Sequence, residues 1–443
     1  MNSQLLNGQF PYLQSGQVYA DWTGAALPPV SLIDEWSDHL RNILLGNPHS
    51  GHEPSLRAAE EIEAAREAVL QFLNADPKEY EVIFTSGATE AIRLLEHYNF
   101  GVGGQLLLTA DNHNSINGLR ETAKRSGAIF TYAPIKGVGE GLVLDTQELT
   151  RLLNYPRSRY GNRLFAYPAK SNYSGNLHSL HWVDYAHRRG WDVLLDAAAF
   201  LANDQLDLSQ VKPDFVPISF YKLFGFPTGV GALVIHRRMF TKLHKKWFTG
   251  GPIMLVSVQR DFFVPDARGA TRYEDGSPNF GMIGAVKNGL DFLNSLGGDR
   301  KAHAVAIAND VWDILYETKE NSNAQIIIHT PRGNDIIAFS VVKDGKIINP
   351  GLFEKMTSDR GFFVRVGCFC NPGVNEKIHG YSVDEVIPRA TDEVIFGLEE
   401  IKRRRQYFAR TAVGSIRASF GYSNSTIDVI RISGHMKNIL REI

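Results

Sequence analysis

The sequence reads VLLDAAA at residues 193–199 and SFYKLFGFPTGVG at residues 219–231. The first segment ends an apolar, strand-like run on Asp196, and the second places Lys222 among aromatic residues and glycines. Both positions are costly for a charged side chain, so each charge needs a partner. Taken singly, the aspartate could cap a helix and the lysine could extend its ammonium group to solvent.

A single bound molecule could partner both charges. A lysine amine that apolar neighbours desolvate loses its proton more readily and becomes a nucleophile toward an aldehyde. Pyridoxal phosphate carries such an aldehyde, and its pyridinium nitrogen pairs with a carboxylate. We therefore interpret Asp196 and Lys222 as parts of a pyridoxal phosphate site.

Short apolar runs alternate with helical patterns between residues 55 and 240, on both sides of these segments. This alternation predicts an α/β fold with a largely parallel sheet that helices cover on both faces. Ligands of such sheets bind at the carboxyl ends of the strands. The expected strands are 82–84, 105–108, 164–167, 193–195 and 231–235.

The pattern changes from about residue 300 onward. A helix is expected over 303–316, one or two strands within 326–342, and a second helix over 384–405. We expect a large domain of residues 46–300 and a smaller α+β domain formed by residues 1–45 with 301–443.

The composition is that of a soluble globular protein, with 443 residues, 43% hydrophobic residues and a net charge of −1. The balanced charge does not indicate nucleic acid or an anionic membrane as a partner. We expect no secretory leader, because no basic segment precedes an apolar core near the N-terminus, and no membrane span, because no apolar run approaches about 20 residues. The two cysteines, Cys368 and Cys370, are typical of a reducing compartment, and we expect a cytoplasmic protein.

A phosphate-binding turn is predicted in VIFTSGATEAIRLL, residues 82–95, which reads as strand, turn and helix. Gly87 permits close approach to the helix N-terminus, and Ser86 and Thr89 offer hydroxyl groups. An ordinary capped connection is the alternative, but the position of this turn ahead of Asp196 and Lys222 favours a phosphate.

Two further polar residues follow other expected strands. His113 could stack on a flat cofactor ring and exchange protons near neutral pH, although many loop histidines are inert. Asn172 could donate a hydrogen bond to a ring oxygen or form an Asx turn.

The cysteines lie in VRVGCFCNPG, residues 364–373. If strand geometry persists to Cys370, the two thiols share one face and Phe369 lies on the other. With only His379 nearby, we expect no metal site, and a disulfide between residues two apart would be strained. The NPG turn predicts an exposed and reactive thiol, with Cys370 ahead of Cys368.

Taken in order, these motifs resemble those of class V aminotransferase-like pyridoxal phosphate enzymes, and specifically cysteine desulfurases. Within that group they are most similar to the N-terminal desulfurase domain of molybdenum cofactor sulfurases. The motifs concerned are FTSGATEA (84–91), SNYSG (171–175), LDAA (195–198), DFVPISFYKLFGFPTG (214–229), GCFCNPG (367–373) and GSIRASFG (414–421). The resemblance implies fold type I, with a mainly parallel seven-stranded sheet between helices, and a homodimer with active sites at the subunit interface.

The resemblance also implies roles for single residues. Lys222 would bond to the cofactor and move the Cα proton of L-cysteine, and the Cys370 thiolate would take the sulfur as a persulfide, releasing L-alanine. Arg417 would grip the substrate carboxylate, with Asn47 nearby. His113, which the resemblance makes catalytic as well, would stack on the ring. The expected cofactor contacts are Ala88, Thr89, His113, Asn172, Asp196, Ser219, Tyr221, Lys222 and, toward the site of the partner subunit, Ser277.

Three departures qualify the resemblance. The chain ends at residue 443, so we expect a standalone enzyme without the C-terminal domain of fused molybdenum cofactor sulfurases, and a protein or small molecule as sulfur acceptor. Asn375 replaces a cysteine, and Ala199 replaces a glutamine that touches the ring in ordinary cysteine desulfurases. The alternatives are a pyridoxal phosphate-dependent lyase, epimerase or selenocysteine lyase on the same fold, and an inactive scaffold.

Overall fold

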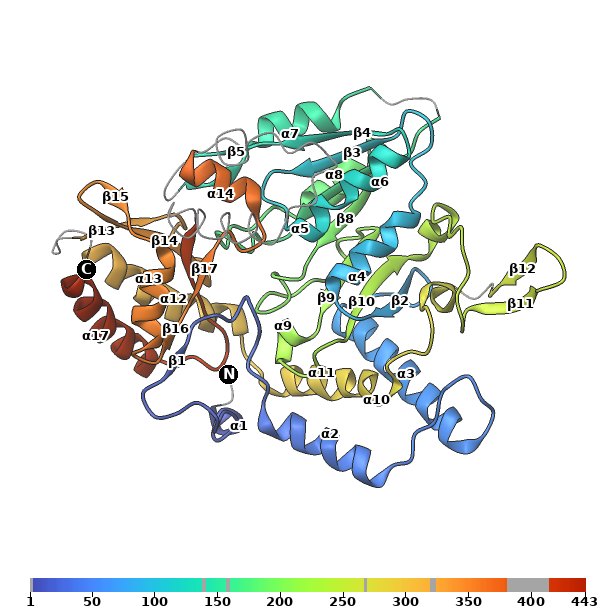
Figure 1. Ribbon diagram of the computed structural model, residues 1–443, viewed down its shortest axis with the longest axis horizontal. Helices are drawn as coiled ribbons and strands as arrows, with labels where there is room; N and C mark the ends of the chain where they lie inside the picture. Colours follow the sequence, from blue (N-terminus) through green and yellow to red (C-terminus); the bar gives the residue numbers. More distant parts are fainter. Residues whose placement is uncertain (1–2, 138–140, 157–159, 267–268, 319–323, 381–413) are drawn as a thin grey trace, which may run out of the picture.

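The computed structural model describes residues 3–137, 141–156, 160–266, 269–318, 324–380 and 414–443. Its largest sheet has seven strands in the order β2-β10-β9-β8-β7-β3-β4 (Figure 1). Strands β9, β8, β7, β3 and β4 pair in parallel, while β10 is antiparallel to both of its neighbours. This sheet confirms the predicted fold class. The strands are β2 (Tyr80–Thr85), β3 (Gln105–Thr109), β4 (Ile129–Ala133), β7 (Arg163–Pro168), β8 (Asp192–Asp196), β9 (Phe215–Ser219) and β10 (Gly231–His236).

The central strands are apolar because both of their faces are covered. Successive side chains of a strand point to opposite faces; accordingly Val193 and Leu195 join one apolar cluster and Leu194 joins another. The first cluster includes residues of α3 (Glu53–Phe72), α7 (Thr146–Leu153), α8 (His181–His187) and α11 (Ala285–Ser295). The second includes residues of α4 (Ala88–Arg93), α5 (Asn114–Asn117) and α6 (Leu119–Arg125).

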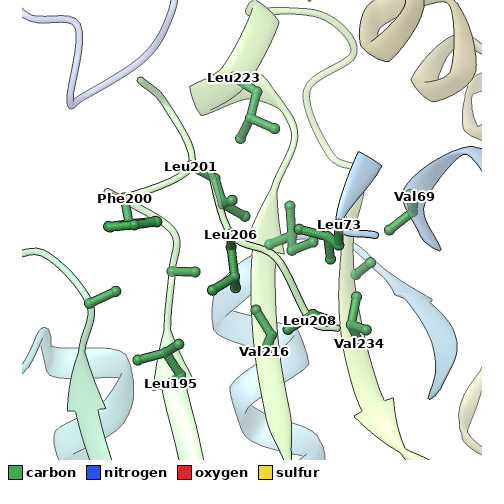
Figure 2. Close-up of a cluster of buried hydrophobic side chains, with 14 of the residues drawn as sticks. Val69, Leu73, Leu195, Phe200, Leu201, Leu206, Leu208, Val216, Leu223 and Val234 are labelled. Carbon is green, nitrogen blue, oxygen red and sulfur yellow. The ribbon is translucent and has the colours of Figure 1, made fainter. Parts of the chain in front are cut away.

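Part of the first cluster is drawn in Figure 2, where Leu223, Leu201 and Leu206 are among the labelled side chains. Leu223 is fully buried and belongs to α9 (Tyr221–Phe224), the single turn that follows β9. The burial of this leucine therefore fixes the turn that carries Lys222.

A second, antiparallel sheet lies to one side of the first (Figure 1). Its strand order is β13-β14-β18-β17, and β15 also pairs with β14. The strands are β13 (Ala324–Ile328), β14 (Ile336–Lys343), β15 (Lys346–Ile347), β17 (Arg365–Gly367) and β18 (Ser415–Ser419), with helices α12 (Arg300–Thr318), α13 (Pro350–Ser358) and α17 (Thr426–Glu442). The helix expected at 303–316 is part of α12, whereas the helix expected at 384–405 lies outside the described residues.

The N-terminal segment contacts both apolar cores. Strand β1 (Val18–Tyr19) pairs with β16 (Phe362–Phe363), and Val18 packs in the core of the second sheet. Leu32, in α2 (Val30–Asn42), packs in the core of the first sheet. The division into 46–300 and 1–45 with 301–443 remains a prediction.

The remaining elements are short. The hairpin formed by β11 (Ile253–Ser257) and β12 (Phe262–Pro265) extends away from the body (Figure 1). The others are α1 (Ser3–Leu6), α10 (Phe280–Ile283), α14 (Pro372–His379), β5 (Ile135–Lys136), β6 (Val143–Leu144) and the 3-10 helices at Leu94–His97, Arg237–Thr241 and Ala270–Tyr273. Among the described residues, no helix combines the length and the apolar character needed to cross a bilayer.

Candidate active site

One pocket collects side chains that follow β2, β3, β7, β8 and β9, at the carboxyl ends of the parallel strands. It encloses about 540 Å³ of atom-free space, part of which is open to solvent. Most of the residues predicted to contact the cofactor line it, namely Ala88, Thr89, His113, Asn172, Asp196, Ser219, Tyr221 and Lys222. The pocket therefore unites motifs that lie far apart in the sequence.

Lys222 is held in the pocket by the geometry of α9. The turn ends at Gly225, which has a φ of 79°, and a Cβ atom there would collide with the backbone of Leu27 and Pro28. Burial lowers the pKa of the Lys222 amine; the Asp196 carboxylate opposes that shift, and Arg417 and Arg365 add to it. A lysine with a lowered pKa is neutral more often, as a nucleophile must be.

Asp196 ends β8 and is 8% exposed. One carboxylate oxygen, Oδ1, accepts a hydrogen bond of 3.0 Å from the backbone N–H of Ala198. This bond is local, and the carboxylate still lines the pocket. A buried carboxylate in a pocket is suited to pair with a cation such as a protonated ring nitrogen.

His113 is positioned by Ser115, a residue that the sequence analysis did not single out. The Ser115 N–H donates to Nδ1 of His113 over 3.1 Å, and the Ser115 hydroxyl lies 3.1 Å from the same nitrogen. Because Nδ1 accepts a backbone hydrogen bond, the neutral imidazole carries its proton on Nε2. Burial lowers the pKa of His113, Asp196 raises it, and Lys222 and Arg417 lower it further.

Hydroxyl groups gather at the end of the pocket where α4 begins. The Thr89 and Ser115 hydroxyls lie 2.9 Å apart, and the Ala88 N–H donates to the Ser219 hydroxyl over 3.1 Å. Hydroxyls and backbone N–H groups are typical ligands of a phosphate. With the Asp196 carboxylate and the Lys222 amine in the same pocket, the residues fit pyridoxal phosphate.

The cysteine loop departs from strand geometry. Strand β17 ends at Gly367, and Phe369 and Cys370 have φ values of 52° and 55°. The condition under which the two thiols would share one face is therefore not met. Both Cys368 and Cys370 are exposed, which confirms the exposure that the NPG turn predicts.

Four hydrogen bonds fasten the cysteine loop to the pocket wall. Asn172 Nδ2 donates to the Phe369 carbonyl over 2.7 Å, and the Asn114 N–H donates to the Cys370 carbonyl over 2.7 Å. Asn371 Nδ2 donates to the Asp111 carbonyl over 2.7 Å and to Asn172 Oδ1 over 3.0 Å. The Asn172 amide, expected to contact a ring oxygen, thus bonds the loop through both of its ends while it lines the pocket.

Arg417 lies in β18 and is 2% exposed. Its Nη1 donates to the Asn172 carbonyl over 2.7 Å, and its guanidinium carbon lies 4.7 Å from the centre of the Phe369 ring. Its Nη2 donates to Asp21 over 3.1 Å, and Asp21 also accepts from Arg365. Neither Asp21 nor Arg365 was a sequence candidate, because ion pairs between residues so distant along the chain leave no pattern.

Asn47 and Ser277 do not line this pocket. Asn47 Nδ2 donates to the Ser277 hydroxyl over 3.1 Å, and Ser277 lines a separate pocket with Ser86 and Glu274. Within the residues described, no group of three or more His, Cys, Asp and Glu side chains is arranged to hold a metal ion.

Curated relatives of this chain include molybdenum cofactor sulfurases. The protein from Danio rerio is 33% identical over 463 residues, which cover 96% of this chain and 53% of the relative. The human protein is 31% identical, and the match covers 94% of this chain and 49% of the human protein. The chain thus spans about half the length of the curated relatives it matches.

Similar solved structures include cysteine desulfurases and a cystine C-S lyase. The apo structure of the enzyme from Thermococcus onnurineus has a TM-score of 0.77 and is 22% identical in sequence. The match covers 96% of this chain and 95% of the chain of that enzyme. The Escherichia coli enzyme CsdA also has a TM-score of 0.77 and is 23% identical in sequence. The match covers 99% of this chain and 98% of the CsdA chain. At such identities these structures establish the fold.

The family model described as "Aminotransferase class-V" matches residues 18–432, a range that includes Asp21, the pocket, the cysteine loop and Arg417. The chain belongs to the class-V aminotransferase family, and its cofactor is pyridoxal phosphate.

Proposed function

We propose that this chain is a cysteine desulfurase that converts L-cysteine to L-alanine and keeps the sulfur on Cys370 as a persulfide. One observation carries the proposal: the exposed cysteine loop is hydrogen-bonded to Asn172 and Asn114, beside the pocket that holds Lys222. The relatives that are named sulfurases and the solved structures that are titled cysteine desulfurases support the same class of reaction.

Several residues of the pocket have a task in this reaction. Pyridoxal phosphate, when bound, supplies the electron sink that makes the substrate Cα proton acidic. Lys222 would hold the cofactor and move that proton, because burial lowers the pKa of its amine and makes the neutral, proton-accepting form more available. Asp196 pairs with the ring nitrogen, and Thr89, Ser219 and the Ala88 N–H hold the phosphate.

Cys370 performs the sulfur step. Its thiolate attacks the substrate sulfur, so that a sulfur–sulfur bond forms as the carbon–sulfur bond breaks. The carbon keeps the electron pair and takes a proton, which yields L-alanine and a Cys370 persulfide. The atoms and electrons balance without an external oxidant or reductant.

The persulfide then passes to an acceptor that can reach an exposed thiol. The name of the curated relatives makes the molybdenum cofactor, or a protein that carries it, the acceptor to test first. A cytoplasmic setting agrees with two free thiols in the described chain.

A homodimer would give Asn47 and Ser277 a role. These two residues bond each other outside the pocket of their own chain. We propose that Ser277 completes the phosphate contacts of the partner subunit and that Asn47 lies near its substrate.

A single-turnover reaction tests the proposal. Cofactor-loaded wild type, Cys370→Ser and Cys368→Ser proteins are mixed with L-cysteine, and both L-alanine and the intact protein mass are measured. We expect one alanine and one added sulfur atom per site, lost in Cys370→Ser and retained in Cys368→Ser. Alanine formation that survives Cys370→Ser would instead favour a lyase on this cofactor, and a wild type that neither binds the cofactor nor reacts would favour a scaffold.

A further inference from the structure

The Asp21 carboxylate is shared by two arginines of the second sheet. Arg365 donates to it from Nε over 2.9 Å and from Nη2 over 2.6 Å, and Arg417 donates from Nη2 over 3.1 Å. The two arginines lie directly opposite each other on β17 and β18, and Asp21 forms a β-bridge with Ser419 two residues beyond Arg417. One carboxylate thus serves two adjacent guanidinium groups.

The sharing is unequal. Arg365 binds Asp21 through two donors, and that bond raises the pKa of Arg365. Arg417 is 2% exposed and gives Asp21 a single donor, while its buried Nε has no hydrogen-bond partner among the residues described. Burial lowers the pKa of Arg417, and Asp21 only partly offsets the shift. Arg417 is therefore a buried cation with incomplete compensation.

The donors involved define what a ligand must do. Two N–H groups on one edge of a guanidinium bind both oxygens of a carboxylate, as Nε and Nη2 of Arg365 bind Asp21. On Arg417 the same edge is only half used, because Nη2 bonds Asp21 and Nε remains unused. A substrate carboxylate that takes this edge needs the donor that Asp21 occupies.

We propose that Asp21 is an internal competitor that the substrate carboxylate displaces from Arg417, and that Arg365 is the positioning residue that retains Asp21 during the exchange. This inference rests on the proposed function, with L-cysteine as substrate, and on the expectation from the sequence that Arg417 binds the substrate carboxylate. The exchange keeps Arg417 partly compensated before substrate arrives. It also selects against amines that lack a carboxylate, because these cannot replace Asp21.

The surroundings of the three residues agree with this assignment. A Cβ atom at Gly24 would lie 2.5 Å from Asp21 Oδ2 and 2.6 Å from Arg365 Nη2, so the pair packs against bare backbone. Another carboxylate within electrostatic reach of Arg365 is the exposed Glu354 of α13. Tyr19 lies near the cluster but is neutral at physiological pH, because burial and Asp21 raise its pKa to about 12.

The Lys222 amine lies close enough to Arg417 and Arg365 for their charges to shift its pKa. Arg417 and Arg365 both lower the pKa of Lys222, so the cluster lies near the group that the substrate amine must approach. A carboxylate bound to Arg417 would therefore also add a compensating negative charge near Lys222.

Arg365→Gln tests the exchange directly. Without its retaining partner, Asp21 has only Arg417 to bind and competes more strongly with substrate. We expect the KM for L-cysteine to rise about tenfold or more while kcat stays within about twofold, the effect of one charged hydrogen bond. The double variant Asp21→Asn with Arg365→Gln should bring KM back toward the wild-type value, which a merely structural defect would not do.

A binding measurement gives a second readout. Cofactor-loaded protein is titrated with L-alanine and with L-alaninamide, which lacks the carboxylate, and the cofactor absorbance is followed. Arg365→Gln should weaken L-alanine alone, and the double variant should restore it; Arg332→Gln, which removes an exposed pair with Asp313, is the matched control.

An unchanged KM in Arg365→Gln, an unrescued double variant, or equal weakening of both ligands would overturn the inference. The two proposals fail differently. If wild type forms no alanine from cysteine but the titrations follow the expected pattern, the desulfurase assignment alone is wrong. If wild type is a desulfurase and the titrations do not follow the pattern, the exchange alone is wrong.

Discussion

Lys222 shows how a single side chain acquires reactivity from its position. It is partly buried on α9, and two nearby arginines disfavour its charged form while Asp196 favours it. The protein therefore holds an ammonium group in surroundings that destabilise it. That destabilisation is measurable in the cofactor-free protein.

We expect Lys222→Met to raise the free energy of unfolding of the cofactor-free protein at pH 7. The pKa of Lys222 in the folded chain is below the ordinary lysine value of 10.5. Between those two values the unfolded chain binds more protons than the folded one, so wild-type stability increases with pH across that interval. The advantage of Lys222→Met should therefore shrink as pH approaches 10.5, by about 1.4 kcal/mol for each unit of pKa lowering.

Urea unfolding of both proteins at several pH values between 7 and about 10 measures this difference. Lys355→Met is the control, since the Lys355 side chain is 76% exposed and pairs only at the surface with Asp359. A Lys222→Met advantage that grows with pH would contradict the assigned cause.

The element that matters most for the site is α9, a single helical turn between β9 and a glycine. Leu223 anchors the turn in the apolar core, and Gly225 lets the chain pass the backbone of Leu27 and Pro28. A short turn held at both ends gives the lysine a fixed direction, which a longer loop would not.

Gly225→Ala should therefore cost both stability and cofactor. A φ of 79° costs a non-glycine residue about 1 kcal/mol, and the new Cβ atom would also collide with Pro28. We expect a thermal midpoint lower by several degrees and less bound cofactor per chain, because α9 must shift. Gly229→Ala is the matched control: Gly229 has a φ of 73° but open space around it, so only the conformational cost applies. Equal losses in the two variants would show that the contact with Pro28 does not position Lys222.

Site residues could be predicted from the sequence where they stand next to a recognisable strand pattern. Lys222 and Asp196 each follow an apolar strand within a few residues, and the pocket contains both. Ser115 was missed because a serine beside a histidine is common in loops. Asp21 and Arg365 were missed because they meet only after β1, β17 and β18 assemble, and no local pattern records that assembly.

At the scale of the whole molecule, a buried ion pair joins the two sheets. Lys170 follows β7 of the large sheet, and its Nζ donates to both oxygens of Asp335, which precedes β14, over 3.1 and 2.9 Å. Asp204 also pairs with Lys170, and all three side chains are 5% exposed or less. The same lysine lines the pocket, so the pair sets how the second sheet, with Arg417, sits relative to the cofactor site.

Lys170→Met should destabilise the protein strongly, because among the described residues it leaves the buried Asp335 carboxylate without a cation and the buried Asp204 carboxylate with Lys301 alone. Removal of one partner from a buried pair costs about 3–5 kcal/mol. We expect a comparable loss in urea unfolding, together with a higher KM for substrate if Arg417 shifts. Arg332→Met removes an exposed pair and should change little. A loss no larger than that of Arg332→Met would mean that Lys170 does not hold the two sheets together.

In the proposed reaction, the four hydrogen bonds that tie residues 369–371 to the pocket wall would also determine how sulfur can leave the protein. An exposed thiol on a long, unattached loop could move outward and deliver its bound sulfur atom to a distant acceptor. Here the carbonyl groups of Phe369 and Cys370 are both anchored, so the thiol can travel little farther than its own side chain allows. The sulfur acceptor must instead approach the Cys370 side chain. Its shape must let the atom that receives the sulfur come within bonding distance of that nearly fixed thiol.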